Sequence, residues 1–357
     1  MPETREVPII LIGLGNVGGA LLGQILDTRE VVACRAHLRL VPVGLADVSG
    51  LVANPDGLAD KYLREILEHV GQGGLLSAQP DVRSLDEIPD QLHAGAILAD
   101  VTAAPATAPL LKQALEIGAR VVLANKNPLS GPWVDAKPFF SHPNLRYEVT
   151  VGAGLPVIDT LHYLLSTGDR ITAIEGCMSG TLGYLCAELE AGRTYSEAIT
   201  HARALGYTEP DPREDLSGRD VARKSLILAR TAGWPLEKSD LSVEELYPKE
   251  LASVTTEEFL NGAGSQDVAY AGRFAAARQE QKTLRYVARV TEHGGTVGLT
   301  AVDQGSPLGA LRGPGNYIAF YTQRYAEIPL VTSGPGAGPA VTAAGVLGDI
   351  IKLAKMG

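Results

Sequence analysis

The stretch VPIILIGLGNVGGALLGQILD, residues 7–27, decides the fold of the N-terminal part of this chain. Residues 7–12 are a short apolar run, residues 13–18 are the glycine turn GLGNVG, and residues 19–27 have the apolar spacing of a helix. A strand that ends in GxGxxG and leads into a helix is typical of dinucleotide-binding folds. The sequence therefore predicts such a fold at the N-terminus.

Further strand candidates follow this turn, with segments between them that are compatible with helices. One such helix, residues 108–118, closes with a glycine just past its last apolar position. Strands that alternate with helices predict a parallel sheet covered on both faces, as in a Rossmann domain. The strand candidates are residues 38–46, 96–99, 120–124 and 145–151.

The regular alternation of strand and helix patterns ends near residue 151, which predicts a second, α+β domain. We expect residues 1–150 to form the NAD(P)-binding Rossmann domain and residues 151–335 the substrate-binding and catalytic domain. The amphipathic segment 338–357 is expected to return to the first domain as a helix. The elements expected in the second domain are helices at 156–166 and 195–205, and strands at 171–177, 283–291 and 296–302.

Composition narrows the class of protein. The chain has 357 residues, 45% of them apolar, and a formal net charge of −10, so no basic surface for nucleic acid or an anionic membrane is expected. No apolar run reaches membrane-spanning length and no signal-peptide pattern is present, which favours the cytoplasm. Three cysteines at unrelated spacings, Cys34, Cys177 and Cys186, favour buried free thiols over disulfides or a zinc site.

The three glycines of the turn are expected to have different structural roles. Gly13 permits the tight turn, Gly15 lets the backbone approach a pyrophosphate, and Gly18 allows close packing of the helix. Asn16 and Val17 complete the turn where the helix begins, so they are also expected to contact the cofactor.

Three residues at the ends of later strands are candidates for the same ligand. Asp47 follows the second strand, later than usual because the first helix is expected to be long; it is expected to bond the ribose hydroxyls and to favour NAD over NADP. The alternative is an aspartate that only starts the next turn. Thr102, in DVTAAP, and Lys126, in ANKNPLS, follow the third and fourth strands, whose carboxyl ends face the ligand crevice.

The segment ARALGYTEPDPREDLSGRDVARK, residues 202–224, is dense in charge between helical patterns. Asp220 and Lys224 lie four residues apart and share one face of the expected helix. An exposed salt bridge is the alternative reading of this pair. The preceding loop is acidic and contains two prolines, as a pocket for an ammonium group would be; its carboxylates are Glu209, Asp211, Glu214 and Asp215.

These motifs resemble the homoserine dehydrogenase family. The match runs from Ala202 through Gly206, Tyr207 and Pro210 to Asp215, Gly218, Asp220 and Lys224, and it extends to GLGNVG, ANKNPLS, EVTVGAGLPVIDTL, SGTLGYL and VTAAGVLGDIIK. It covers essentially the whole chain. The resemblance implies NAD(P)-dependent interconversion of L-aspartate 4-semialdehyde and L-homoserine, in threonine, methionine and isoleucine biosynthesis.

The resemblance also implies roles for individual residues. Lys224 is similar to the proton donor, oriented through Asp220, and Lys126 to the lysine at cofactor and substrate, although the two lysine roles could be exchanged. Glu209 resembles the residue that grips the substrate amino group, with Asp215 and Asp220 in the same pocket. Thr102 and Gly338 are similar to positions that touch the nicotinamide.

A monovalent-cation site and an assembly follow from the same resemblance. The cation, Na⁺ in the family's pattern, is held mainly by backbone carbonyls, at positions that match Glu148, Val151, Ala153 and Leu155. The second domain's sheet is expected to pair two subunits in a homodimer. The resemblance is to the short form without a regulatory or aspartate kinase domain, so no inhibition by threonine is expected.

Two other functions are alternatives to this one. An aspartate semialdehyde dehydrogenase needs an activated cysteine, for which Cys177 in EGCMSG is the candidate, without a histidine nearby in sequence. A protein that only senses NAD(H) has no use for the lysine and carboxylates between Glu209 and Lys224.

Overall fold

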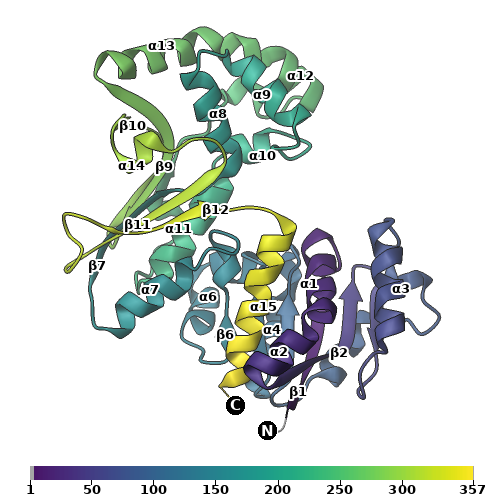
Figure 1. The fold of residues 1–357 in the computed structure, drawn as a ribbon. Helices are drawn as coiled ribbons and strands as arrows, with labels where there is room; N and C mark the ends of the chain where they lie inside the picture. The colour runs from purple at the N-terminus through teal and green to yellow at the C-terminus, as the bar shows by residue number, and fades with distance from the viewer. Residues whose placement is uncertain (1–3, 357) are drawn as a thin grey trace. The chain divides into compact units, whose positions relative to one another are not determined.

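The computed structural model describes residues 4–356, which form two compact units. One unit ends at Gly154 and takes up the chain again at Ala337, and the other runs Leu155–Gly336. Each unit is built on its own six-stranded sheet (Figure 1). Within residues 4–356, no helix combines the length and the apolar character needed to cross a membrane.

The sheet of the first unit has the order β3-β2-β1-β4-β5-β6. All neighbouring strands are parallel except β3, which pairs antiparallel with β2. The predicted Rossmann-type fold is confirmed, whereas the hairpin strand β3 was not predicted. The strands are β1 (Arg5–Ile12), β2 (Leu38–Asp47), β3 (Gly50–Ala53), β4 (Ile97–Asp100), β5 (Arg120–Leu123) and β6 (Leu145–Arg146).

The strand predicted over residues 145–151 is wrong beyond Arg146. Residues Glu148–Thr150 form a 3-10 turn, η5, and the next residues, Gly152 and Ala153, have φ of 83° and 53°. The backbone N–H of Glu148 donates to the Asp349 carboxylate at 2.9 Å instead of to a strand. A tertiary contact therefore overrides the strand-like local sequence.

The first helix is also not the single long element that was expected. It breaks at Thr28, whose hydroxyl donates to the Gln24 carbonyl at 2.7 Å, and a second helix follows at once. This second helix carries Cys34, which is exposed, so the expectation of three buried thiols fails for that residue. The helices of this unit are α1 (Asn16–Asp27), α2 (Arg29–Ala36), α3 (Asp60–Gly71), α4 (Ala108–Glu116), α5 (Asn127–Ser130), α6 (Trp133–Phe140) and α15 (Pro339–Lys355).

The C-terminal helix α15 belongs to the first unit. It lies beside α1, and the two are seen as neighbouring yellow and purple helices in Figure 1. Apolar residues of both helices, among them Leu21, Leu22, Val346 and Ile350, are fully buried in one core cluster with the strands. Burial of four such side chains contributes on the order of 6–12 kcal/mol, so packing fixes α15 on the sheet.

The sheet of the second unit has the order β12-β11-β7-β9-β10-β8 and is antiparallel except between β10 and β8. The three strands predicted for it are confirmed, and three more were missed. Its strands are β7 (Ile171–Cys177), β8 (Leu241–Val243), β9 (Lys282–Thr291), β10 (Gly294–Asp303), β11 (Gly315–Thr322) and β12 (Leu330–Pro335).

Helices α8, α11 and α13 pack on the central strand β9 of this sheet. Both predicted helices are confirmed as α7 and α9, and α9 begins with a capping box in which Thr194 and Glu197 bond each other's backbone N–H groups. The helices are α7 (Val157–Ser166), α8 (Gly180–Glu190), α9 (Tyr195–Ala204), α10 (Arg213–Leu216), α11 (Arg219–Thr231), α12 (Thr256–Gly262), α13 (Asp267–Gln279) and α14 (Pro307–Ala310).

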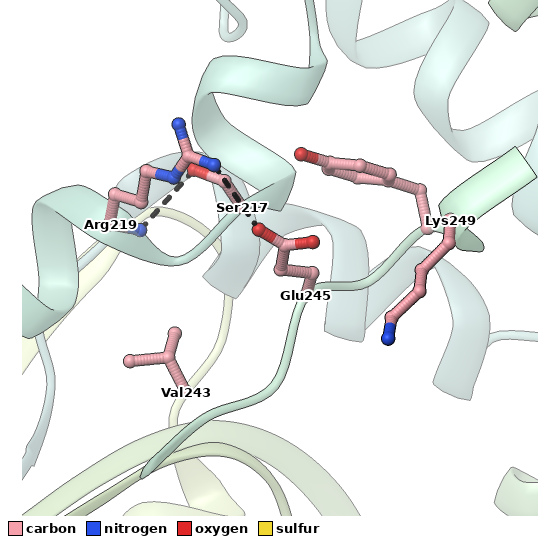
Figure 2. A pocket seen from close by; sticks show the side chains of 6 residues that line it. Ser217, Arg219, Val243, Glu245 and Lys249 are labelled. Carbon is pink, nitrogen blue, oxygen red and sulfur yellow. Dashed lines mark hydrogen bonds and ion pairs between the residues drawn. The ribbon is translucent and has the colours of Figure 1, made fainter. Parts of the chain in front are cut away.

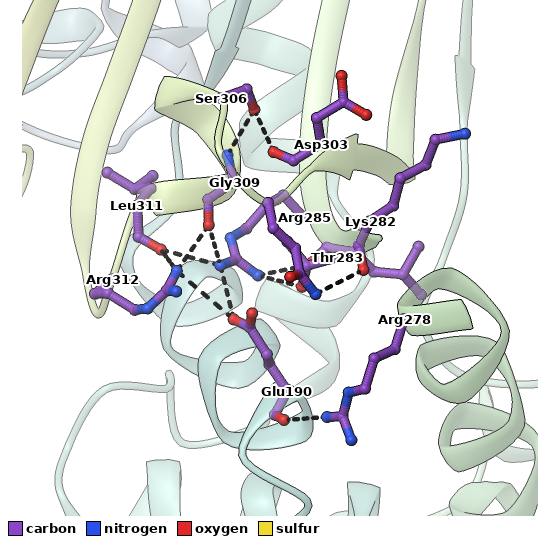
Figure 3. Close-up of polar contacts among 12 residues, drawn as sticks. Glu190, Arg278, Lys282, Thr283, Arg285, Asp303, Ser306, Gly309, Leu311 and Arg312 are labelled. Carbon is purple, nitrogen blue, oxygen red and sulfur yellow. Dashed lines mark hydrogen bonds and ion pairs between the residues drawn. The ribbon is translucent and has the colours of Figure 1, made fainter. Parts of the chain in front are cut away.

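A buried ion pair joins α8 to β9 in this unit (Figure 3). The side chain of Arg285 is 3% exposed, and its Nη2 lies 2.7 Å from the Glu190 carboxylate. The same nitrogen donates to the Gly309 carbonyl at 2.8 Å, and Nη1 donates to the Thr283 hydroxyl at 3.0 Å. Glu190 thus neutralises a guanidinium that the fold has removed from water.

We expect Glu190→Ala to lower the free energy of unfolding by about 3 kcal/mol, because it leaves Arg285 buried without its counter-charge. Lys282→Ala removes the exposed pair with Glu280 and is the control, with little expected change. Urea unfolding of the full chain measures both variants. Equal losses for the two would contradict the role of the buried pair.

Candidate functional site

The glycine turn between β1 and α1 depends on close backbone packing. Gly13 has φ of +98°, a conformation that other residues rarely adopt. A Cβ on Gly18 would lie 1.9 Å from the Gly13 carbonyl oxygen, so no side chain fits there. A Cβ on Gly15, in contrast, would have nothing within 4 Å. The turn is therefore closed on its inner side and open at Gly15, where a ligand can approach the backbone.

The N-terminus of α1 is suited to an anion. The helix begins at Asn16, its N-cap Gly15 makes no side-chain hydrogen bond, and no acidic residue lies in the first turn. The first backbone N–H groups of a helix lack intrahelical partners, and the helix dipole adds partial positive charge there. Asn16, Val17 and Gly18 are the residues that carry these groups, as a diphosphate requires.

A cavity of about 760 Å³ opens beside this turn, and it brings together four of the predicted cofactor residues, Gly13, Gly15, Asp47 and Thr102. The remainder of its wall is mostly apolar, which suits an adenine ring. Sequence analysis missed these apolar residues because they come from helices and loops that are far apart in the sequence. They include Val48, Val70, Leu75, Leu85, Ile88, Val101 and Leu110.

Asp47 lies at the end of β2 and starts the turn that follows, which is the alternative role given for it above. Its Oδ1 accepts hydrogen bonds from the Ser49 N–H at 2.7 Å and the Ser49 hydroxyl at 2.6 Å, as an aspartate that starts a turn does. Its Oδ2 accepts from the Leu76 N–H at 2.8 Å. These bonds fix a carboxylate at the cavity wall, with lone pairs left for a ligand hydroxyl.

Thr102 is held by a buried network at the carboxyl ends of β4 and β5. Its hydroxyl donates to the Asp100 carboxylate at 2.7 Å, and the fully buried Asp100 also accepts from Thr107 and from the Asn125 amide, at 2.7 and 3.0 Å. Asp100 and Asn125 were not predicted as site residues. Their positions after two neighbouring strands were the signal that could have found them.

Five other predicted cofactor residues do not line this cavity: Asn16, Val17 and Gly18, which continue into α1, and Lys126 and Gly338. Lys126 is the N-cap of α5 and is half-buried just after β5. Gly338 is the N-cap of α15 and has φ of +116°. Both lie where a chain segment enters a helix, which is the geometry expected from their motifs.

In the second unit, the predicted pair on α11 forms. The Lys224 Nζ lies 2.9 Å from the Asp220 carboxylate, and it donates a second hydrogen bond to the Met178 carbonyl at 2.7 Å. The Lys224 side chain is only 12% exposed. The ammonium of Lys224 is therefore largely removed from water and held at two points, while the Asp220 side chain is 47% exposed.

Asp215 lies in a second polar group close to the start of α8. Its carboxylate accepts from the Thr181 hydroxyl at 3.0 Å and from the Glu209 N–H at 2.9 Å. Burial raises the pKa of Asp215, while these two hydrogen bonds lower it. Asp215 thus positions the backbone of Glu209, whose own side chain is exposed. Thr181 was missed, although it lies within the SGTLGYL motif.

One carboxylate of the acidic loop, that of Asp211, forms an ion pair within the protein. Asp211 forms an ion pair with Arg213 at 2.6 Å, and the Arg213 guanidinium lowers the pKa of that carboxyl. Arg213 also donates to the Val254 carbonyl at 2.6 Å. Asp211 therefore stabilises the loop, and it is not available to an ammonium ligand.

A separate hollow of about 440 Å³ lies in the second unit (Figure 2). Its exposed Arg219 and Glu245 pair at 3.4 Å. None of the predicted substrate residues lines it, so it is distinct from the group around Lys224. It is lined by Ser217, Arg219, Val243, Glu245, Tyr247 and Lys249.

Three of the four residues expected at a cation lie in the irregular segment that follows β6. Glu148, Val151 and Ala153 are 5%, 0% and 8% exposed, and Leu155 is the first residue of the other unit. One carboxylate with backbone carbonyls is an oxygen donor set, which fits a hard cation. Across residues 4–356, no three His, Cys, Asp or Glu side chains gather as a metal site.

The cysteine required by the thioester alternative is not activated. Cys177 is 3% exposed and packs in a hydrophobic cluster with Val287 and Ala319. Burial raises the pKa of the Cys177 thiol to about 12. A nucleophilic cysteine needs a lowered pKa, so the structure disfavours a semialdehyde dehydrogenase of the thioester kind.

Comparison with known proteins agrees with the motifs. The family model described as homoserine dehydrogenase matches residues 156–351. A homoserine dehydrogenase of Paracoccidioides brasiliensis is 42% identical over 369 residues, which cover 98% of both chains. The turn, sheet and cavity define a Rossmann-fold dinucleotide-binding protein. More particularly, the chain belongs to the homoserine dehydrogenase family.

Solved structures have the same fold. A Candida auris protein of unknown function matches with a TM-score of 0.86 and 32% identity over 98% of both chains. A hyperthermophilic archaeal homoserine dehydrogenase in complex with NADPH matches with a TM-score of 0.71 and 26% identity, over 98% of this chain and 97% of that one. The chain spans only 38% and 43% of the first two relatives it matches, bifunctional aspartokinase/homoserine dehydrogenases of Zea mays and Haemophilus influenzae.

The contrast between Gly15 and Gly18 gives a matched pair of variants. Gly18→Ala should lower the melting temperature and abolish NADH binding, because its Cβ collides with the Gly13 carbonyl. Gly15→Ala should keep the wild-type melting temperature and raise the Kd for NADH at least about tenfold, because its methyl occupies ligand space. Thermal unfolding and NADH fluorescence titration check both; a Gly15→Ala variant with wild-type affinity would contradict the placement of the diphosphate.

Proposed function

We propose that this chain interconverts L-aspartate 4-semialdehyde and L-homoserine, with a nicotinamide dinucleotide as hydride carrier. The observation that carries the proposal is Lys224, whose ammonium is held by Asp220 and the Met178 carbonyl in the part of the chain that the family model matches. Membership of the family supports this reaction over other reductions of small aldehydes.

The reaction needs a hydride on the aldehyde carbon and a proton on its oxygen. When bound, the dinucleotide supplies the hydride. Lys224 donates the proton, and its charge stabilises the developing alkoxide. Asp220 orients the ammonium of Lys224. Lys126 polarises the same oxygen and contacts the dinucleotide. In the reverse direction, Lys224 accepts the proton of the homoserine hydroxyl.

The acidic residues near Lys224 select the substrate. We assign the substrate ammonium to the exposed carboxylate of Glu209, because the Asp215 carboxylate already fixes the Glu209 backbone. Asp215 and Asp220 add negative charge to the same pocket. This arrangement favours amino acids over simple aldehydes and alcohols.

The cofactor is proposed to be NAD rather than NADP. The residues expected to hold it are Gly13, Gly15, Asn16, Val17 and Gly18, together with Asp47, Thr102, Lys126 and Gly338. Asp47 would repel a 2′-phosphate, and the residues that line the cavity include no lysine or arginine to neutralise one. The archaeal relative is described with NADPH, which supports a nicotinamide dinucleotide in this fold.

We further assign Glu148, Val151, Ala153 and Leu155 to a monovalent cation, most simply Na⁺. Such an ion would supply positive charge to a buried group of oxygens and would hold the irregular backbone of residues 148–153 in place. We also propose a homodimer built through the second sheet, and a place in threonine, methionine and isoleucine biosynthesis. The family resemblance supports these assignments.

Replacement of Lys224 tests the assignment of the proton donor. We expect the wild type to oxidise homoserine faster with NAD than with NADP, and Lys224→Ala to lower kcat by about 100- to 10,000-fold. The affinity for NADH should stay unchanged, because Lys224 is not among the residues assigned to the dinucleotide.

Lys249→Ala is the matched control, since Lys249 is an exposed lysine of the same unit outside the assigned machinery. Steady-state rates with both cofactors and NADH titration report on both variants. Near-normal turnover by Lys224→Ala would remove Lys224 from the reaction.

A further inference from the structure

The backbone of α15 packs directly on the segment to which we assign the cation. A Cβ on Gly345 would lie 2.4 Å from Val149 Cγ1 and 3.4 Å from the Ala153 carbonyl oxygen. A Cβ on Gly154 would lie 2.6 Å from the Val341 carbonyl oxygen. Neither position tolerates a side chain, so helix and segment are in close contact at Val341 and at Gly345, about one turn apart.

Asp349 lies four residues after Gly345 and therefore on the same face of α15. Its side chain is fully buried. Oδ2 accepts the Glu148 N–H at 2.9 Å, and this bond takes Glu148 out of the strand that its sequence favours. Asp349 thus fixes the start of the segment that contains Glu148, Val151 and Ala153.

The second oxygen of Asp349 makes a long ion pair but no hydrogen bond. Oδ1 is buried without a hydrogen-bond partner, and the guanidinium of Arg146, itself 29% exposed, lies 3.9 Å away. That separation is beyond hydrogen-bond range. The long ion pair with the partly exposed Arg146 offsets only part of the cost of burying this carboxylate, so a further cation bound nearby would stabilise it.

We propose that Asp349 is a positioning residue of the cation site: it holds the Glu148 backbone through Oδ2, and the negative charge on its carboxylate strengthens binding of Na⁺ by the segment 148–153. The proposal rests on the assignment of the cation to that segment. Through Asp349, the cation stabilises the docking of α15 in the first unit. Outer partners of a metal site typically contribute about 10- to 100-fold in affinity.

The test is thermal unfolding of the full chain in sodium chloride and in choline chloride at equal ionic strength. The wild type should melt at a higher temperature in sodium, with a shift that saturates as sodium rises. Asp349→Asn keeps an oxygen for the Glu148 N–H and removes the charge. It should weaken the apparent sodium affinity about 10- to 100-fold.

Asp169→Asn is the matched control, because Asp169 is also buried, bonds the Thr322 hydroxyl at 2.7 Å, and lies in the other unit. It should lower the melting temperature in both salts and leave the sodium-dependent shift unchanged. If Asp349→Asn does not fold, Asp349→Glu keeps the charge but displaces it, and it should also weaken the sodium dependence.

The outcomes distinguish the role of Asp349 from the existence of the cation site. A full wild-type shift retained by the Asp349 variants would overturn the role of Asp349 and leave the cation site standing. A wild type without any sodium-dependent shift would overturn the cation site and, with it, the role of Asp349. Neither result depends on turnover, so failure of the proposed reaction is measured separately.

Discussion

The contact between Gly18 and the Gly13 carbonyl is the constraint on which the first unit depends. It lets α1 begin immediately after β1, so the first N–H groups of the helix face the edge where β1, β2 and β4 end. The cavity forms at that edge, with the carboxylate of Asp47 at one strand end and the Asp100 network at another. A turn with larger side chains would displace α1. Helix α15 packs against α1, so it would then lose part of its packing surface.

In the second unit, charged groups are held in fixed positions among largely buried residues. Lys224 is restrained by Asp220 and by a main-chain carbonyl, and Asp215 is restrained by Thr181 and a main-chain N–H. Each charged group therefore has one side-chain partner and one backbone partner. Such double anchoring reduces the reorganisation needed when charge develops in a reaction. Arg285 is likewise held by both side-chain and backbone partners, among them Glu190 and the Gly309 carbonyl.

Features that depend on residues close together in the sequence could be predicted from local sequence patterns. The apolar runs and the GxGxxG spacing fix β1, α1 and most later elements, and the spacing of four places Asp220 beside Lys224. Features set by distant residues were missed: the strand over 145–151 fails because Asp349, 201 residues away from Glu148, takes its N–H. Thr181 and Asn125 were not predicted as site residues for the same reason, since their partners lie 34 and 25 residues away in sequence. Substrate identity came from the family resemblance, because a lysine and carboxylates define a chemistry but not one aldehyde.

The most direct test of the central claim is to follow the hydride itself. The purified chain is incubated with aspartate 4-semialdehyde and NADH that carries deuterium at both C4 positions of the nicotinamide, and the product is examined by mass spectrometry and proton NMR. We expect homoserine with one deuterium, located on C4, the former aldehyde carbon. Homoserine without deuterium, or semialdehyde consumed only when phosphate and oxidised cofactor are supplied, would contradict the central claim.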